Sequence, residues 1–410
     1  MNEKQKPSIR FKGFTEAWEQ RKLGEISDVR DGTHESPQYV KEGHPFITSK
    51  NVADGYINYN DIQYISTCDY NEINKRSKVD INDILMGMIG TIGNLALIRE
   101  IPNFAIKNVA LIKYIGKVYS YYLYHALQSR CVIRQLSNGL DGGTQKFIAL
   151  NKVRELKIPV PDNKEQYKLG EYFETLDRLI TLHQRKYDKL VNVKKSMLEK
   201  MFPHDGKNVP EIRFAGFTEA WEQRKVTDIG KIYIGLVTTM TKYYTEDGTL
   251  LIRNSDIKDG RFEFGVNPIY LEKSFALKNE SRMHQLGDVI TVHTGDVGTS
   301  AVITENEVKS IGFATIVTRP IKETIDSNYL CSFLNTDKHK KWAVGVSTGD
   351  GRTNYNLGDY YELIVPVPSV KEQQKIATFI QKLNHLITLH QRELEKLKNI
   401  KKSCLEKMFV

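Results

Sequence analysis

A few groups of residues in this sequence have the types that catalysis requires, but their spacings do not complete a catalytic motif. Pro161-Asp162 with Glu165 and Lys168 has the composition of a nuclease site, yet the separation of the glutamate from the lysine is wrong for one. Residues 267–270, Asn-Pro-Ile-Tyr, lack the second proline of the Asn-Pro-Pro-Tyr motif of amino-methyltransferases. The sequence contains no Walker loop, no G-x-G-x-x-G, no H-E-x-x-H and no C-x-x-C. It therefore predicts a chain that catalyses nothing and binds no metal or cofactor of its own.

Polar and cationic side chains gather instead near glycine-rich turns, where they could contact nucleic acid. Gly90 and Gly93 in the first half, and Gly295 and Gly298 in the second, predict tight turns after short apolar strands, although such pairs could also cradle phosphate. Polar side chains on loops of this kind can read base edges, and cations can hold phosphates. We expect DNA contacts from Thr48, Ser49, Lys50, Asn51, Thr91, Lys107, Asn108, Gln145 and Lys146, and from Arg253, Asn254, Ser255, His293, Thr294, Thr299, Arg352, Thr353 and Asn354. The polar loops at residues 139–147 and 347–356 are the first candidates.

The segments that must position these loops are duplicated. The ten residues G-F-T-E-A-W-E-Q-R-K occupy positions 13–22 and again positions 216–225. L-I-T-L-H-Q-R at residues 179–185 recurs at 386–392, and L-E-K-M-F at 198–202 recurs at 405–409. The residues between these repeats align only faintly. Each half therefore has a constant lead segment, a divergent body and a constant exit, which indicates an internal duplication.

The divergent bodies predict a mixed α/β fold. Residues 54–66 and 259–271 alternate apolar and polar side chains behind an Asp-Gly pair, which predicts strands after a turn. Residues 120–136 and 327–344 predict helices. We expect two tandem α/β (α+β) domains with an antiparallel two-helix coiled coil and internal pseudo-two-fold symmetry.

The constant exits predict long helices. Prolines stand just before each helix, where they cannot break it. Asp162 with Glu165, and Ser369 with Glu372, have the spacing of capping boxes. Apolar residues then recur at alternating steps of four and three, which indicates a coiled-coil seam. The seam of the first helix is Leu169, Phe173, Leu176, Ile180, His183, Tyr187, Leu190, Lys194, Met197 and Met201, and that of the second is Ile376, Ile380, Leu383, Ile387, His390, Leu394, Leu397, Lys401, Cys404 and Met408.

Two interpretations of these helices stay open. They pair with each other, or each covers only the core of its own domain. The histidines at matching seam positions, His183 and His390, are either packed seam residues or a pH-sensitive joint.

The positive charge of the chain is concentrated in the exit helices. The whole chain has a formal net charge of +9, of which residues 164–202 carry +3 and residues 371–410 carry +5. Lysine-rich helix surfaces are either simply solvated or lie along a polyanion and neutralise its phosphates. The 4 cysteines are widely scattered, no apolar run is long enough to span a bilayer, and no apolar signal core follows the first residues. We therefore expect a cytoplasmic protein with reduced thiols.

The order of these segments resembles the specificity subunit of type I restriction-modification systems. The resemblance covers both halves. It is carried by the lead segments at residues 11–23 and 214–226, the Gly-x-x-Gly turns, the segments 158–166 and 365–373 before each exit helix, and the exit helices themselves. Any one of these motifs is a modest signal, but their order, found twice, is highly specific.

The resemblance implies a division of labour between the parts of the chain. Each divergent body would be a target recognition domain that reads one half of a bipartite, asymmetric site in double-stranded DNA, and the coiled coil would set the unread gap. The constant regions would hold two modification subunits, which carry S-adenosylmethionine and methylate adenine N6. Restriction subunits would use ATP and Mg²⁺ for translocation and cleavage.

The expected boundaries follow from the repeats. They are residues 1–161 for the first recognition domain, 162–204 for the central helix, 205–368 for the second recognition domain and 369–410 for the C-terminal helix. The alternatives are a coiled-coil scaffold that does not bind DNA and an inactive allele of the same family. A fusion of modification and restriction activities is disfavoured because the corresponding motifs are missing.

Overall fold

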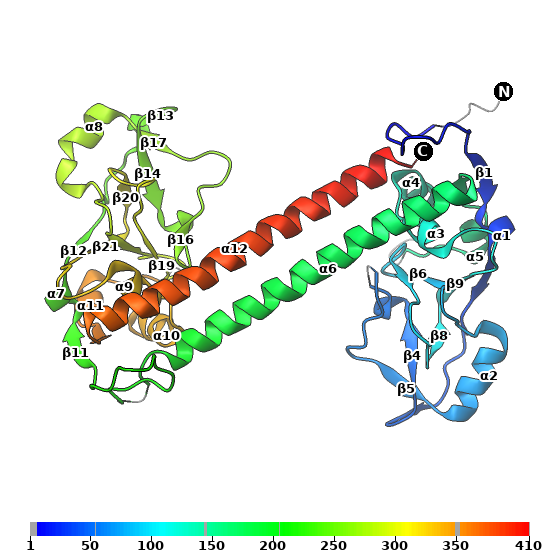
Figure 1. Cartoon of the computed structure of the whole chain (residues 1–410), viewed down its shortest axis with the longest axis horizontal. Coiled ribbons are helices and arrows are strands. Elements are labelled where there is room, and N and C mark those ends of the chain that lie inside the picture. The colour runs from blue at the N-terminus through cyan, green and yellow to red at the C-terminus, as the bar shows by residue number, and fades with distance from the viewer. Residues whose placement is uncertain (1–5, 54, 143–145, 205, 349–352, 410) are drawn as a thin grey trace. The chain divides into compact units, whose positions relative to one another are not determined.

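The structure is a computed structural model that describes residues 6–53, 55–142, 146–204, 206–348 and 353–409. The chain forms two compact units. Unit 1 comprises Met1–His183 with Glu393–Val410, and unit 2 comprises Gln184–Arg392. Each unit consists of one divergent body, its lead segment, and parts of both exit helices (Figure 1).

Unit 1 contains two four-stranded sheets and a two-stranded ribbon, with strand orders β2-β9-β6-β7, β3-β5-β4-β8 and β1-β10 among the described residues. The strands are β1 (Glu19–Lys22), β2 (Asp28–Asp31), β3 (Tyr39–Val40), β4 (His44–Thr48), β5 (Gln63–Ile65), β6 (Ile84–Gly87), β7 (Leu95–Leu97), β8 (Ala105–Lys107), β9 (Val109–Lys113) and β10 (Lys157–Val160). Its short helices are α1 (Leu23–Ile26), η1 (Ser49–Asn51), α2 (Thr67–Ser77), α3 (Ser120–Leu127), α4 (Arg130–Asn138) and α5 (Leu150–Arg154).

Unit 2 repeats this topology with strand orders β12-β21-β18-β19, β13-β17-β14-β20 and β11-β22, and adds the hairpin β15-β16. The strands are β11 (Glu222–Lys225), β12 (Gly230–Ile234), β13 (Tyr244–Thr245), β14 (Thr249–Arg253), β15 (Ile257–Lys258), β16 (Arg261–Phe262), β17 (Tyr270–Leu271), β18 (Val289–Thr291), β19 (Ser300–Val302), β20 (Ile311–Phe313), β21 (Ile316–Pro320) and β22 (Ile364–Val367). The short helices are α7 (Val226–Ile229), η2 (Thr241–Tyr243), η3 (Asn254–Asp256), α8 (Lys273–Lys278), η4 (Glu280–Arg282), α9 (Ser327–Leu334), α10 (Asp337–Val346) and α11 (Leu357–Tyr361).

The mixed α/β fold and the tight glycine turns are confirmed. Gly90, Gly93, Gly295 and Gly298 all have positive φ, between 73° and 103°, and lie in the turns from β6 to β7 and from β18 to β19. The predicted helices are present, each broken into two, as α3 with α4 and α9 with α10.

The predicted alternating strands are only partly confirmed. Of the described residues 55–66, only β5 is a strand, whereas residues 259–271 contain β16 and β17, and Asp259-Gly260 forms the turn of the β15–β16 hairpin. Ile57 and Ile62 nevertheless pack on the core of their sheet, so the alternation reflects half-burial without ladder pairing.

The lead segment and the segment before each exit helix form one antiparallel ribbon in each unit. Glu19 pairs with Val160 in the β1–β10 ribbon, and Glu222 pairs with Val367 in the β11–β22 ribbon. The constant motifs that lie far apart in the sequence are therefore neighbours in the fold.

The exit helices are α6 (Asn163–Lys200) and α12 (Val370–Lys407). All predicted seam residues lie within the described chain, and all are buried or half-buried. The buried ones are Leu169, Phe173, Leu176, Lys194, Met201, Ile376, Ile380, Leu383, Ile387, Leu394 and Met408. Ile180, His183, Tyr187, Leu190, Met197, His390, Leu397, Lys401 and Cys404 are half-buried.

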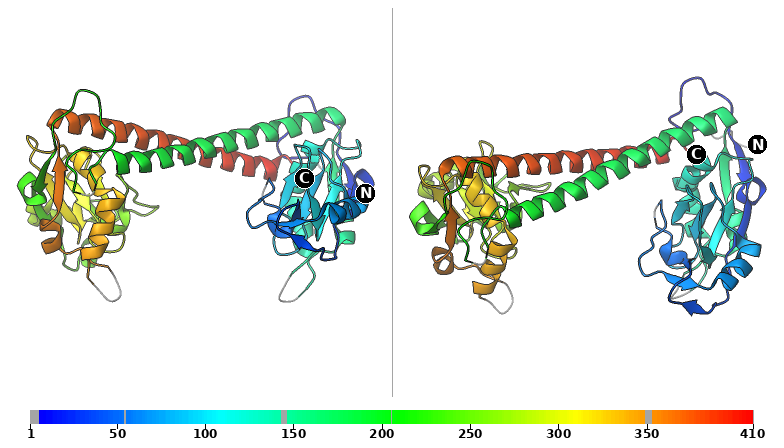
Figure 2. Two further views of the ribbon diagram at one scale, coloured as in Figure 1. Left: turned by 90° about the horizontal axis from the view of Figure 1, so that it is seen from below. Right: turned by 60° about the horizontal axis from the view of Figure 1, so that its bottom comes forward.

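The helices pair in an antiparallel sense. In unit 1, the hydroxyl of Tyr172 lies 3.5 Å from Sγ of Cys404, and Asp177 forms an ion pair of 2.7 Å with Lys401. As the residue number increases along α6, the number of the contacting residue in α12 decreases, so the two helices are antiparallel. In unit 2, Leu190, Met197 and Leu198 of α6 share a core with Ile376 and Ile380 of α12, and the two segments again run in opposite directions (Figures 1 and 2).

The capping box of the first exit helix is only half confirmed. The carboxylate of Asp162 accepts the backbone N–H of Glu165 at 3.1 Å, as a cap should. The side chain of Glu165 instead accepts two hydrogen bonds of 2.7 Å from Arg10, and the side chain of Glu372 is bound in the same way by Arg213. Each glutamate thereby links the arginine that directly precedes a lead segment to an exit helix. Among the described residues, no helix is long and apolar enough to cross a membrane.

Candidate nucleic-acid interface

Ser49 is the hub at which three loops of unit 1 meet. Its buried hydroxyl donates a hydrogen bond of 2.6 Å to the carbonyl oxygen of Asn108 and accepts one of 3.1 Å from the backbone N–H of Met88. The hydroxyl of Thr91 donates to the carbonyl oxygen of Ser49 at 2.6 Å. The segment after β4, the Gly-x-x-Gly turn after β6 and the turn between β8 and β9 are thereby fixed at one edge of the body.

The first polar loop attaches to the same edge. Phe147 forms isolated β-bridges with Ile89 in the Gly-x-x-Gly turn and with Asp141. One contiguous edge therefore carries these separate polar segments. We call this edge the unit 1 loop edge, defined by residues 48–51, 88–94, 107–108 and 146–147.

The side chains predicted to contact DNA have different surroundings on the unit 1 loop edge. Lys50, Thr91 and Lys146 are exposed, whereas Thr48, Lys107 and Asn108 are half-buried and Ser49 and Asn51 are buried. Asn51 accepts from the Thr48 backbone N–H at 3.0 Å and donates to the carbonyl oxygen of Asn58 at 3.1 Å, so it shapes the turn η1. Gln145 lies outside the described residues. The DNA contacts themselves stay predictions.

His34 borders the unit 1 loop edge and was missed by sequence reasoning. Its Nδ1 is 2.8 Å from Oδ1 of Asn108, and its Nε2 is 2.8 Å from Oδ2 of Asp31. The hydrogen bonds to Asn108 and Asp31 raise the pKa of His34 above its ordinary value. Arg76 forms an ion pair with Asp31 from the other side.

Unit 2 builds the same edge with different side chains. Asn254 occupies the hub in place of Ser49. Its amide donates to the carbonyl oxygen of Ala314 at 3.0 Å, and its Oδ1 accepts the backbone N–H of His293 at 2.8 Å. The second polar loop joins through Asn354, which forms isolated β-bridges with Thr294 and Thr348. We call this the unit 2 loop edge, defined by residues 253–255, 293–298, 313–314 and 353–354.

The side chains of unit 2 that are predicted to contact DNA again have different surroundings. Ser255 is exposed, Arg253, Asn254, His293, Thr294, Thr353 and Asn354 are half-buried, and Thr299 is buried, where its hydroxyl donates to Asp296 at 2.8 Å. Arg253 is held in a bidentate ion pair with Asp256. Burial lowers the pKa of His293, which favours its neutral form. Arg352 lies outside the described residues.

In each unit, one segment beside the loop edge begins at a glycine that the fold requires, and that glycine is a sequence signal by which the segment could have been identified. A Cβ at Gly32 would lie 2.4 Å from the carbonyl oxygen of Ile106, and a Cβ at Gly235 would lie 2.3 Å from that of Gly312. Only glycine permits this close backbone approach. It brings the segments that begin at Gly32 and Gly235, including His34 and Val237, alongside the turns at Asn108 and Ala314.

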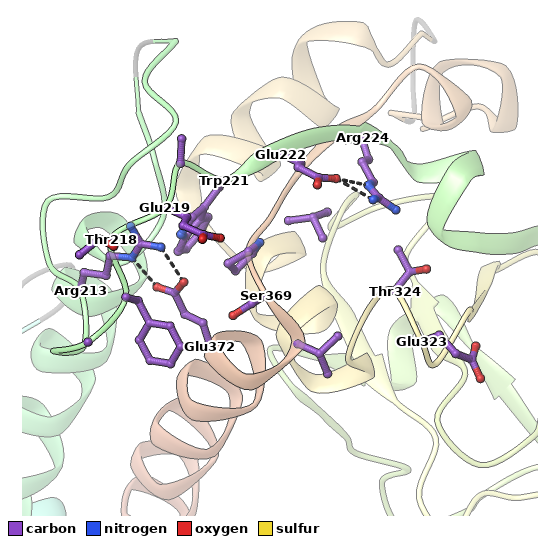
Figure 3. Close-up of a pocket in the computed structure, with 16 residues that line it drawn as sticks. Arg213, Thr218, Glu219, Trp221, Glu222, Arg224, Glu323, Thr324, Ser369 and Glu372 are labelled. Carbon is purple, nitrogen blue, oxygen red and sulfur yellow. Dashed lines mark hydrogen bonds and ion pairs between the residues drawn. The ribbon is translucent and has the colours of Figure 1, made fainter.

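The repeated lead segments form a different kind of site. In unit 2, a cavity of about 470 Å³ is lined by Thr218, Glu219 and Ala220 and reaches the Arg213–Glu372 pair (Figure 3). Trp221 is buried beside Arg213, while Thr218, Glu219 and Ala220 are exposed. Some of the repeated residues therefore make contacts inside the unit, and others form an exposed surface. Neither group contributes to the loop edges defined above.

Comparison with known proteins agrees with this architecture. The chain is 24% identical to the MjaX specificity subunit of Methanocaldococcus jannaschii, covering 95% of this chain and 92% of that one. It is 21% identical to the EcoBI specificity subunit of Escherichia coli, covering 96% and 86%. Its fold is similar to the crystal structure of the S subunit of a type I restriction-modification system from M. genitalium, with a TM-score of 0.62 at 15% identity and 99% of both chains covered.

The family assignment rests on both halves. Residues 15–192 and 218–399 each match the type I restriction modification DNA specificity domain. Each match begins within a lead segment and ends within an exit helix, as the repeats do. The chain belongs to the family of type I restriction-modification specificity subunits.

Proposed function

We propose that this chain reads a bipartite, asymmetric site in double-stranded DNA, with one half-site read by the loop edge of each unit. The observation that carries the proposal is that one scaffold presents two different sets of side chains at equivalent positions. Ser49 is replaced by Asn254 at the hub, and Asn108 is replaced by Ala314 at the neighbouring turn. A duplicated frame with rewritten loops suits the recognition of two different short sequences.

The chain would direct chemistry that its partners perform. Two modification subunits would supply S-adenosylmethionine and methylate adenine N6, and restriction subunits would supply ATP- and Mg²⁺-dependent translocation and cleavage. Acting on chromosomal DNA, the complex would work in the cytoplasm.

We place the modification subunits on the outward surface of the repeated lead segments. Thr218, Glu219 and Ala220 border the cavity of unit 2, and Thr15 and Glu16, their counterparts in unit 1, are exposed as well. A surface that occurs twice with identical residues fits two identical partners.

The test is to co-express the chain with a matching modification subunit in a host that lacks DNA methylation and to map N6-methyladenine across the genome. We expect a motif with two defined half-sites and a fixed unread gap. A complex that is assembled and folded but methylates nothing would leave the scaffold and inactive-allele interpretations.

Exchanging residues 23–158 for those of a relative should then change one half-site and leave the other half-site and the gap unchanged. A change in both half-sites would contradict the assignment of one half-site to each unit.

A further inference from the structure

The hydrogen-bond partners of His34 favour its imidazolium form. Both ring nitrogens face oxygen atoms at 2.8 Å, Oδ2 of Asp31 and Oδ1 of Asn108. A carboxylate oxygen and an amide oxygen only accept hydrogen bonds, so both nitrogens must donate. Both ring nitrogens donate only in the imidazolium form. Asp31 is largely buried, with 12% of its side chain exposed, while 64% of the His34 side chain is exposed.

The charged groups around His34 act in opposite directions. Asp31 favours the imidazolium, and Arg76, which pairs with Asp31, opposes it. The two hydrogen bonds of His34 outweigh burial and Arg76, so the pKa of His34 is raised overall. The imidazolium is therefore present below this raised pKa and is lost as the pH rises through it.

The imidazolium determines what Asn108 can offer to a ligand. Its Oδ1 is engaged by His34, which leaves the Nδ2 group, a hydrogen-bond donor, as the part of the amide that can face outward. Asn108 sits in a turn with a φ of 52°, and its carbonyl oxygen is held by the hub Ser49. Its backbone is thus fixed, and only the side-chain amide can rotate.

We propose that His34 is a positioning residue that presents Asn108 as a hydrogen-bond donor to a base edge in the half-site read by unit 1. The inference rests on the proposed function. Asparagine with both amide groups free pairs with adenine through N6 and N7. Because the hydrogen bond with His34 turns Oδ1 toward the histidine, Asn108 presents its Nδ2 donor outward, so the matching base presents an acceptor, as guanine does with O6 and N7 or thymine with O4.

Loss of the His34 proton reverses this selection. Asp31 keeps the proton on Nε2, so Nδ1 becomes an acceptor that faces Oδ1 of Asn108. The amide relieves this repulsion by rotating through about 180°, which places Nδ2 against His34 and Oδ1 outward. Asn108 then accepts from the base, and its preference for an acceptor base is lost.

Unit 2 provides an internal comparison. Val237, which is 68% exposed, follows Gly235 by two residues as His34 follows Gly32, and Ala314, with a φ of 48°, stands where Asn108 does. Neither side chain titrates or carries an amide. Recognition of the second half-site should therefore lack this dependence on pH.

The experiment measures binding of the complex of the full chain with its modification subunit to duplexes that carry single base-pair changes in the methylated motif. For the unchanged chain at pH 6, replacing the acceptor base in the first half-site should weaken binding about 10- to 100-fold. In the N108A variant, replacing that base should no longer weaken binding, while the effects of changes at all other base pairs stay as they were. In the H34Q variant, replacing the base should weaken binding less than in the unchanged chain, and this loss of affinity should be the same at pH 6 and at pH 8.5.

His44 supplies a matched control. Its Nδ1 lies 2.8 Å from Oδ1 of Asn103, a second histidine–asparagine pair of the same unit, at the opposite end of β4 from the loop edge. H44Q should leave both the penalty and its pH dependence unchanged. Hydrogen exchange on each variant separates these effects from unfolding.

The outcomes distinguish this inference from the proposed function. A wild-type complex that shows no bipartite site contradicts the proposed function. A wild-type complex with such a site, whose first half-site is read identically after N108A, overturns only the role of Asn108. If N108A acts but H34Q preserves the pH dependence, the positioning role of His34 is overturned.

Discussion

The backbone N–H of Ile9 donates a hydrogen bond of 3.0 Å to the carbonyl oxygen of Lys407, which lies at the other end of the sequence. In unit 2, the equivalent hydrogen bond runs from the backbone N–H of Ile212 to the carbonyl oxygen of Lys200 at 2.9 Å, and these two residues lie close together in the sequence. Each unit is therefore closed by the repeated Leu-Glu-Lys-Met-Phe ending, supplied to unit 1 by α12 and to unit 2 by α6. The repeated residues that make these contacts are therefore needed twice for folding.

The phenylalanine of each ending should stabilise one unit only. Phe409 packs on Trp18, Tyr122 and Phe173 with ring-centroid distances of 5.5–6.2 Å, and Phe202 packs on Trp221, Tyr329 and Phe333 at 5.4–6.2 Å. Truncating a buried phenylalanine to alanine costs about 3–5 kcal/mol. F409A should lower the hydrogen-exchange protection of unit 1, and F202A that of unit 2. Equal loss in both units after either change would contradict this division.

Arg213, which directly precedes the second lead segment, should stabilise unit 2 more than Arg10, which directly precedes the first, stabilises unit 1. Glu165 and Glu372 have 0% and 1% of their side chains exposed, and each is paired with an arginine. Removing one partner of a buried ion pair costs about 3–5 kcal/mol because the other charge is left uncompensated.

The two glutamates differ in their second partner. In unit 1, Nε1 of Trp18 donates to Glu165 at 2.9 Å, whereas Nε1 of Trp221 is buried and has no hydrogen-bond partner among the described residues. In urea unfolding, R213Q should therefore lower the free energy of unfolding more than R10Q does. The pair R213M/E372M should recover part of the loss, and a larger effect of R10Q would argue against this reasoning.

The sequence predicts the long helices and their seam well because spacing alone decides which face of a helix is buried. Leu169 and Phe173, and equally Ile376 and Ile380, are buried as the alternating steps of four and three require. The capping glutamates show the limit of local patterns. Glu165 stands at the right distance from Asp162, but Arg10, which is 155 residues away, binds it more strongly than the backbone could.

The sequence predicts which regions form the loop edges, but it does not predict which of their side chains are free to contact DNA. Ser49 and Asn51 look like exposed polar loop residues in the sequence, yet their hydrogen bonds are made within the protein. His34 contacts Asn108 across 74 residues, and only the fold brings them together. A single sequence contains no periodicity that reports such a non-local pair.

Unit 2 should lose stability in acid because of two buried histidines. Burial lowers the pKa of His284 and of His339 to about 4 from an ordinary value near 6.5. Between these values the unfolded chain binds protons that the folded chain does not, so stability is fully present above about pH 6.5 and falls towards pH 4.

Each histidine should contribute about 1.4 kcal/mol per pH unit to this slope within the window. H284Q and H339Q should each reduce the slope of the unfolding free energy against pH in this range, measured by urea titration at several pH values. An unchanged slope in the double variant would contradict the assignment, whatever the loss of absolute stability.

The lysines of the unit 1 loop edge should account for part of the salt dependence of DNA binding. Within the described residues, the ammonium of Lys50 donates to the carbonyl oxygen of Asp61 at 3.4 Å, and that of Lys107 donates to the hydroxyl of Ser36 at 2.6 Å. Both acceptors are neutral, so the two charges are not neutralised there. A lysine that neutralises a phosphate contributes about one unit to the slope of log K against log salt. K50A and K107A should each lower that slope by about one for the complex on its methylated motif.

Arg253 and Lys117 provide the comparison. Arg253 already forms a bidentate pair with Asp256, so R253A should change the slope less than K50A does. Lys117 donates to the carbonyl oxygen of Glu25, beside the lead segment and away from the loop edge, so K117A should leave the slope unchanged. If K117A lowered the slope as much as K50A, the phosphates would lie over a surface other than the loop edge, because counterion release counts only the cations that meet the DNA.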